Sequence, residues 1–238
     1  MPVQKVQWPT GQTLMIDADD TLWENSIYFE QAIDEFISFL NHKEQTRQQV
    51  REHLNNIEHT RVGVHGYGLK PFQHSLLICF EELSGAAPTS EQRSSIESFA
   101  RSIHRDEMEL LPGISSTIAY LSSRHRIILV TKGDDQEQRH KLQSSGLLPH
   151  FHHVEVLPEK HVDAYHSLRD RHACEAHRTW MIGNSPKSDI NPALAAGLNA
   201  VFIPHESTWV LEHSEIDAPT ADRHLLQLNN FSDLAEIF

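Results

Sequence analysis

The amino-acid sequence predicts an α/β fold built on a parallel sheet, and two observations support this prediction. Five short apolar runs have the length and the bulky composition of buried strands, and each ends at polar or glycine-containing residues. These runs are 14–16, 127–130, 154–157, 180–182 and 200–203. Helical patterns separate the last four runs, and such alternation is typical of a parallel sheet. We therefore expect a Rossmann-like core with helices on both faces of the sheet.

The helices of this core are expected from apolar spacing and from end signals. Before the second strand, Ile114, Ile118 and Leu121 recur at the spacing of one helix face. The other expected helices are 136–145, 161–172 and 190–196. Gly146 and Gly197 follow two of them, and glycine is favoured where a helix stops.

The segment between the first and second strands contains no convincing strand and predicts an inserted all-helical subdomain. Its apolar residues recur at helical spacing in four groups: Phe29, Ile33, Phe36, Ile37 and Leu40; Val50, Leu54 and Ile57; Leu76, Phe80 and Leu83; Ile96, Phe99 and Ile103. Thr89 and Gln92 have the spacing of a capping box. We expect a core of residues 1–22 and 108–238, with residues 23–107 as a cap above the strand ends where ligands bind in open α/β sheets.

Composition excludes several classes of function. The chain has 238 residues, a net charge of −13 and no run of Lys or Arg, which disfavours nucleic acid and anionic membranes as partners. No stretch approaches the roughly 18 apolar residues that a membrane span requires, and residues 1–12 lack the apolar region of a signal peptide. Two cysteines are ordinary in a reducing compartment. We therefore expect a cytoplasmic protein; no feature indicates its oligomeric state.

Polar side chains follow four of the five predicted strands, and this placement points to a catalytic site. They are Asp17, Asp19 and Thr21 after the first strand, Thr131 and Lys132 after the second, Lys160 after the third, and Asn184 and Asp189 after the fourth. The carboxyl ends of parallel strands meet at one edge of a sheet, so we expect these groups to converge there. Clustered carboxylates need a cation, and oxygen ligands favour Mg²⁺, whereas the amines and hydroxyl suit a phosphate.

The same residues resemble the four motifs of the haloacid dehalogenase-like superfamily. Asp17-x-Asp19-x-Thr21 is similar to motif I, Thr131 to motif II and Lys160 to motif III. Motif IV is resembled by Gly183-Asn184-x4-Asp189, and the helical insertion stands where that superfamily carries its C1 cap. The resemblance covers essentially the whole chain and implies a phosphatase of this superfamily.

The resemblance also implies roles for these residues. Asp17 would attack phosphorus and form an aspartyl-phosphate, with Asp19 as general acid and then general base. The expected magnesium ligands are Asp17, the backbone carbonyl of Asp19, Asn184 and Asp189; the expected phosphate contacts are Thr131, Lys132 and Lys160. The substrate would be a small phosphorylated metabolite, of the sugar phosphate or nucleoside monophosphate class.

Two departures from the motifs leave roles open. Asn184 stands where motif IV often has Asp, so either its amide oxygen ligates the metal or Asp189 takes the larger share. Lys132 stands where many members have a small polar residue, and it either contacts phosphate or pairs with Asp189.

Three other functions compete with a phosphatase. A 2-haloacid dehalogenase shares the fold and cap, but its chemistry needs neither a proton donor nor Mg²⁺, so Asp19 argues against it. A phosphomutase would return the phosphoryl group to a second hydroxyl, and the sequence does not exclude it. A non-catalytic binding protein is disfavoured because the motif residues are intact.

Two further segments have a plain interpretation beside a functional one. His150-Phe151-His152-His153 resembles a zinc cluster, but adjacent residues on a strand face opposite ways, so we expect an ordinary loop and strand. Residues 66–71 break the helical pattern and predict a loop between helices. If this loop faces the substrate, Tyr67 and Lys70 are its candidate contacts.

Overall fold

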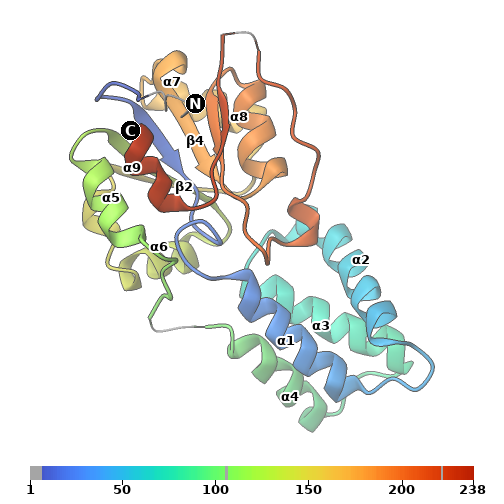
Figure 1. The fold of residues 1–238 in the computed structure, drawn as a ribbon. Coiled ribbons are helices and arrows are strands. Elements are labelled where there is room, and N and C mark those ends of the chain that lie inside the picture. The colour runs from blue at the N-terminus through green and yellow to red at the C-terminus, as the bar shows by residue number, and fades with distance from the viewer. Residues whose placement is uncertain (1–6, 105–106, 221) are drawn as a thin grey trace. The chain divides into compact units, whose positions relative to one another are not determined.

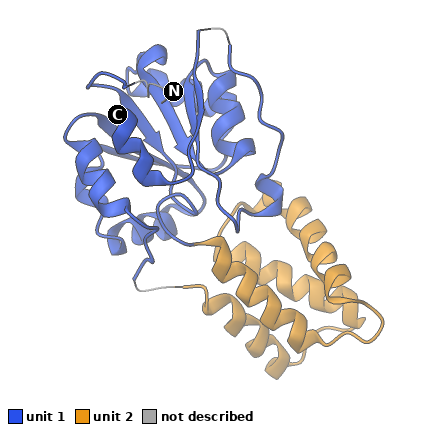
Figure 2. Cartoon of the chain, viewed as in Figure 1, with its two compact units in different colours: residues 1–24, 107–238 blue, residues 25–106 orange. Residues whose placement is uncertain are grey.

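The computed structural model describes residues 7–104, 107–220 and 222–238. The chain divides into two compact units, an α/β unit of residues 1–24 and 107–238 and a helical unit of residues 25–106 (Figure 2). From the sequence we expected the helical unit to span residues 23–107. Residues 105 and 106, which fall in the expected helical subdomain, lie outside the described residues.

The α/β unit contains a six-stranded sheet, within the described residues, in which every strand pairs in parallel with its neighbours (Figure 1). Its strands are β1 (Thr13–Ile16), β2 (Arg126–Lys132), β3 (His153–Leu157), β4 (Thr179–Gly183), β5 (Asn199–Phe202) and β6 (Leu225–Gln227). Their order is β3-β2-β1-β4-β5-β6. The chain therefore reverses its direction of winding between β1 and β4, which places the switch point at the ends of these two strands.

Helices cover both faces of this sheet because its side chains alternate between two cores. Leu14 and Ile16 of β1 pack with α5 and α9, whereas Met15 packs on the other face with α7 and α8. The helices are α5 (Ile114–Ser122), α6 (Asp135–Ser144), α7 (Val162–Arg171), α8 (Asn191–Ala195) and α9 (Leu234–Ile237). Short turns complete the unit: η1 (Leu148–His150), η2 (Ala176–Arg178), the π-helical turn η3 (Pro186–Ile190), η4 (Val210–Glu212) and η5 (Phe231–Asp233).

The helical unit consists, within residues 25–104, of α1 (Ser26–Leu40), α2 (Arg47–His65), α3 (Leu69–Ser84) and α4 (Ser90–Arg101). Each helix buries one apolar stripe in a shared core, and the most buried members include Phe36, Leu54, Leu76 and Ile96. The expected capping box of Thr89 and Gln92 forms at the start of α4, and Thr46 with Gln49 forms a second one at α2.

The loop between α2 and α3 is shorter than the sequence indicated. Leu69 already begins α3, so Lys70 and Pro71 belong to the first helical turn, where the missing N–H of proline costs no intrahelical hydrogen bond. Gly66 and Gly68 have φ angles of 71° and 113°, which side chains rarely adopt, so glycine is required at both. The short connections make neighbouring helices antiparallel, and the loop therefore lies at the end of the bundle where α1 begins and α4 ends.

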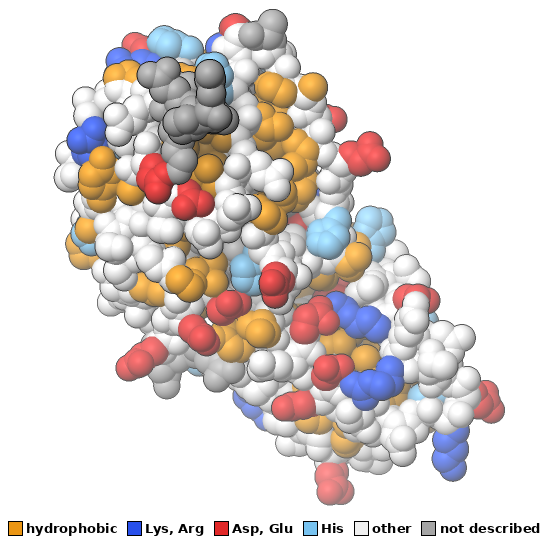
Figure 3. Space-filling model, viewed as in Figure 1, with side chains coloured by type: hydrophobic (Ala, Val, Ile, Leu, Met, Phe, Trp, Pro, Cys, Tyr) orange, Lys and Arg blue, Asp and Glu red, His pale blue; other side chains and the backbone are white. Residues whose placement is uncertain are grey.

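Surface and helix properties agree with the sequence composition. On the face shown in Figure 3, acidic side chains are spread over both units and no broad area of Lys and Arg is visible. Within the described part of the chain, we find no helix with the length and apolar character needed to cross a membrane.

Candidate active site

Asp17 directly extends β1 at the switch point of the sheet. Its backbone N–H donates to the carbonyl of Ile182 in β4, at 2.9 Å, and its side chain is buried. The chain then turns tightly: the amides of Thr21 and Leu22 both donate to the carbonyl of Ala18. This turn returns the Thr21 hydroxyl to Asp17, where it donates to Oδ2 at 2.9 Å.

Lys160 joins Asp17 to Asp189. Its ammonium contacts Asp17 Oδ1 on one side and lies 2.8 Å from Asp189 Oδ1 on the other. Burial opposes the charge on Lys160, but the two carboxylates outweigh burial and raise its pKa above the usual value. Lys160 follows β3 and Asp189 lies in the turn after β4, so two strand ends supply this pair as the sequence predicted.

Asp189 is fully enclosed by the turn that carries it. The backbone N–H of Ser185 donates to Asp189 Oδ2 at 3.0 Å, and a side chain at Gly183 would place its Cβ only 2.2 Å from that oxygen. Glycine is therefore required at position 183. Burial and the neighbouring Asp17 raise the pKa of Asp189 to about 7, although Lys160 acts in the opposite direction. Two buried carboxylates with one ammonium between them favour a further cation at this site.

Asn184 lies beside these carboxylates. Its amide oxygen is 3.2 Å from the Thr21 hydroxyl, which also contacts Asp17, and its amide nitrogen donates to Thr208 Oγ1 at 3.0 Å. The predicted metal ligands Asp17, Asn184 and Asp189 therefore belong to one hydrogen-bonded group that includes Thr21 and Lys160. Carboxylate and amide oxygens are the donors that Mg²⁺ prefers, so this donor set fits Mg²⁺.

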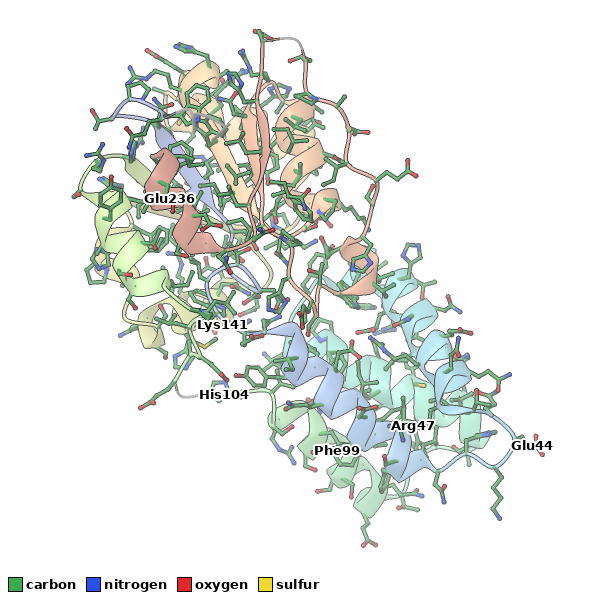
Figure 4. The ribbon with its side chains drawn as sticks, viewed as in Figure 1. Glu44, Arg47, Phe99, His104, Lys141 and Glu236 are labelled. Atoms are coloured by element: carbon green, nitrogen blue, oxygen red, sulfur yellow. The ribbon has the colours of Figure 1, made fainter. Side chains whose placement is uncertain are left out.

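Asp19 is held by three donors. Trp23 Nε1 donates to Oδ1 at 2.7 Å, Gln138 Nε2 donates to Oδ2 at 2.9 Å, and Lys141 Nζ lies 3.0 Å from both oxygens. Burial alone would raise the pKa of Asp19, but these donors, Lys141 first, lower it below the usual value. Figure 4 labels Lys141 on α6, close to the chain that follows β1.

Gln138 and Lys141 were not singled out from the sequence. They lie three residues apart on α6, so they share one helix face, but that helix does not place them at a strand end. Gln138 also connects Asp19 with Thr131. Its Nε2 donates to Asp19, and its Oε1 accepts from the Thr131 hydroxyl at 3.2 Å. The only sequence signal was this i, i+3 spacing of two polar residues behind motif II.

Lys132 is engaged at the rim of the site. Its ammonium donates to Glu212 Oε1 at 2.6 Å and to Ser188 Oγ at 2.8 Å. Burial raises the pKa of Glu212, but the Lys132 charge, with the hydrogen bonds, reverses this and lowers it. Lys132 therefore neutralises a buried glutamate that sequence reasoning missed, and its contact with phosphate stays a prediction.

The histidine cluster of residues 150–153 takes part in ordinary structural contacts. His152 Nδ1 accepts from the backbone N–H of Ile127, and His150 lies within hydrogen-bond distance of the Ser122 hydroxyl. These contacts tie the loop before β3 to β2 and α5.

The family model of haloacid dehalogenase-like hydrolases matches residues 12–197. The chain belongs to this family. Among curated proteins, none matches it.

Solved structures of the same family resemble the whole chain. A haloacid dehalogenase-like family hydrolase from Xanthomonas campestris is 26% identical with a TM-score of 0.82, covering 99% of this chain and 93% of its own. The HAD-hydrolase YfnB from Bacillus subtilis, described as bound to magnesium, is 18% identical with a TM-score of 0.67 and coverages of 96% and 98%. L-2-haloacid dehalogenase from Xanthobacter autotrophicus is 14% identical with a TM-score of 0.64 and coverages of 95% and 97%. The last two show the shared fold alone.

Proposed function

We propose that this hydrolase is a magnesium-dependent phosphomonoester phosphatase that works through an aspartyl-phosphate on Asp17. The observation that carries the proposal is the ordered carboxylate of Asp19, two residues after the buried Asp17 and held by Trp23, Gln138 and Lys141. An alkoxide leaving group needs a proton, and a second carboxyl beside the nucleophile can supply it. A halide leaving group needs none.

The residues divide the reaction between them. Asp17 attacks phosphorus. Asp19, whose pKa is lowered by Lys141 and its other donors, takes up a proton on substrate binding, gives it to the leaving alkoxide and then takes one from the water that hydrolyses the intermediate. Lys160 reduces the repulsion between Asp17 and the phosphate dianion, and Thr131 donates to a phosphoryl oxygen. A magnesium ion, held by Asp17, the Asp19 carbonyl, Asn184 and Asp189, would supply positive charge for the developing negative charge.

The helical unit is proposed to act as a cap that closes over a small phosphorylated metabolite. A sugar phosphate or a nucleoside monophosphate is the class that such a cap suits, and a cytoplasmic location fits substrates of this kind. YfnB, of the same fold, is described as showing interdomain movement, which supports a mobile cap here.

A direct experiment separates the candidate reactions. Purified protein is assayed for phosphate release from an aryl phosphate and from a panel of phosphometabolites, with Mg²⁺ and with a chelator, and for halide release from a 2-haloacid. We expect phosphate release that requires Mg²⁺ and is reduced at least 100-fold in Asp17→Asn, a loss of about 3 kcal/mol of transition-state stabilisation. Halide release without phosphate release would overturn the proposal in favour of a dehalogenase. Phosphoryl transfer to a second hydroxyl would favour a phosphomutase.

A further inference from the structure

Asn184 presents a problem that an aspartate at the same position would not have. A carboxylate offers oxygen at both ends, whereas an amide offers oxygen at one end and an N–H donor at the other. Only the oxygen can ligate a cation. The side chain is therefore useful in a magnesium site only if something determines which end faces Asp17 and Asp189.

The Thr21 hydroxyl does not determine this orientation. It lies 2.9 Å from Asp17 Oδ2 and 3.2 Å from Asn184 Oδ1, and it has a single hydrogen. If the hydrogen is given to Asp17, the Thr21 oxygen can accept from the N–H of a flipped Asn184 amide. If it is given to Asn184, it pairs with the amide oxygen. Thr21 accommodates either orientation of the amide.

Thr208, at the opposite end of the amide, favours one orientation. Its oxygen accepts the Asn184 N–H at 3.0 Å, and its hydrogen is given to the backbone carbonyl of His205 at 2.9 Å, a group that can only accept. The amide N–H is therefore satisfied when the amide oxygen faces Asp17 and Asp189. A flipped amide would bring its oxygen to Thr208, and the hydroxyl would have to turn away from His205 to place its hydrogen between the two oxygens.

The segment that carries Thr208 is folded into a turn on one side and attached to the Asp189 turn on the other. In the turn, the Ser207 N–H donates to His205 Nδ1 and the Thr208 N–H donates to the His205 carbonyl. On the other side, Glu212 Oε2 accepts from the hydroxyls of Ser185 and Ser188 at 2.6 and 2.5 Å. These serines belong to the same turn as Asp189, so the segment that carries Thr208 is attached to the turn that follows Asn184.

We propose that Thr208 is a positioning residue that makes Asn184 present its amide oxygen, and not its nitrogen, to the magnesium site. The inference rests on the metal-binding part of the proposed function. Thr208, in the loop after β5, would orient the Asn184 amide, which the residues of motif IV do not do by themselves. Where the ligand is an amide, a hydroxyl oxygen that accepts the amide N–H supplies the orientation that a carboxylate does not need.

The test measures the binding of Mg²⁺ to the metal-free protein by calorimetry, without substrate. We expect Thr208→Val, which keeps the shape and loses the hydroxyl, to weaken Mg²⁺ binding about tenfold, the low end of what residues behind metal ligands contribute. Thr208→Ser keeps the hydroxyl and is expected to stay within about twofold of the wild type, a rescue that a merely structural role for the threonine methyl would not give. The thermal unfolding midpoint of each variant shows whether it is folded.

Repeating the Thr208 substitution in an Asn184→Asp protein shows whether its effect depends on the amide. Asn184→Asp removes the asymmetry of the amide and adds a negative charge, so it should bind Mg²⁺ more tightly. In this background, Thr208→Val should change the affinity less than about threefold, because both ends of residue 184 are then oxygen. An equal loss in both backgrounds, or no loss in the Asn184 protein, would overturn the inference. Phosphatase assays of the wild type test the proposed function separately. A protein that releases no phosphate can still bind Mg²⁺ in a way that depends on Thr208, and a phosphatase can bind Mg²⁺ without any contribution from Thr208.

Discussion

Lys141 lies 3.0 Å from both carboxylate oxygens of Asp19, although the two residues are more than a hundred positions apart in the chain. The ammonium fixes the carboxyl group that the proposed mechanism uses first as proton donor and then as proton acceptor. We predict that Lys141→Gln lowers phosphatase turnover about tenfold or more, because Asp19 then loses its fixed orientation. The measurement is kcat with an alkyl phosphate at saturating Mg²⁺.

The exposed Lys43 provides a matched control. Lys43→Gln makes the same chemical change in the helical unit and should leave kcat unaltered. If the two variants behave alike, Lys141 has no part in positioning Asp19.

Asp19→Asn should discriminate between substrates by their leaving groups. The amide cannot donate a proton to an alkoxide, so single-turnover formation of the aspartyl-phosphate from an alkyl phosphate should slow by about 100-fold or more. An activated aryl phosphate releases a stable phenolate and should be affected far less in this step. Similar losses with both substrates would argue that the substitution misplaces Asp17 or Lys141, and would remove Asp19 as the proton donor.

The strands that position the site residues were predicted from the sequence, whereas most of the side-chain contacts around those residues were not. The strands β1 to β5 were predicted because each is a short apolar run, and their ends bring Asp17, Lys160 and Asp189 together. The strand β6 (Leu225–Gln227) was missed, because it has three residues and pairs only with β5 at the edge of the sheet.

The missed site residues share a physical cause. Gln138 and Lys141 come from a helix, Thr208 comes from a loop and Glu212 comes from the short turn η4. Their place beside Asp19 and Asn184 depends on how these segments pack against the sheet, and no local pattern encodes that packing. The strand-end residues were accessible to sequence reasoning because the topology of a parallel sheet alone brings them to one edge.

Glu58 in α2 predicts a pH dependence of stability in the helical unit. Burial raises its pKa from 4.5 to about 7, although Arg51 opposes the shift. The folded protein therefore holds a proton that the unfolded chain has released between pH 4.5 and 7, so the free energy of unfolding should fall as the pH rises through this window. At pH 8 the full cost applies, about 3 kcal/mol from the shift.

The measurement compares denaturant unfolding of the wild type and Glu58→Gln. The neutral glutamine should stabilise the protein at pH 8 by up to about 3 kcal/mol relative to pH 4, where the glutamate is largely protonated in both states. Glu52→Gln, at an exposed position of the same helix, is the control and should show no such pH-dependent difference. A constant difference between Glu58→Gln and wild type across this range would mean that Glu58 does not titrate in the folded protein.

The connection between α2 and α3 offers a test of substrate recognition by the helical unit. Tyr67 lies between two glycines with positive φ angles, and Lys70 belongs to the first turn of α3, at the end of the bundle where the chain enters and leaves the unit. We predict that Tyr67→Ala and Lys70→Ala change the ranking of substrates across a phosphoester panel while a very small phosphoester is hydrolysed at nearly the wild-type rate. Contacts made equally with substrate and transition state appear in KM, whereas contacts that drive closure of the unit also lower kcat. Lys43→Ala, at the opposite end of the same bundle, should leave the ranking unchanged. If Tyr67→Ala and Lys70→Ala also preserve the wild-type ranking on every substrate, recognition of the leaving group belongs to other residues.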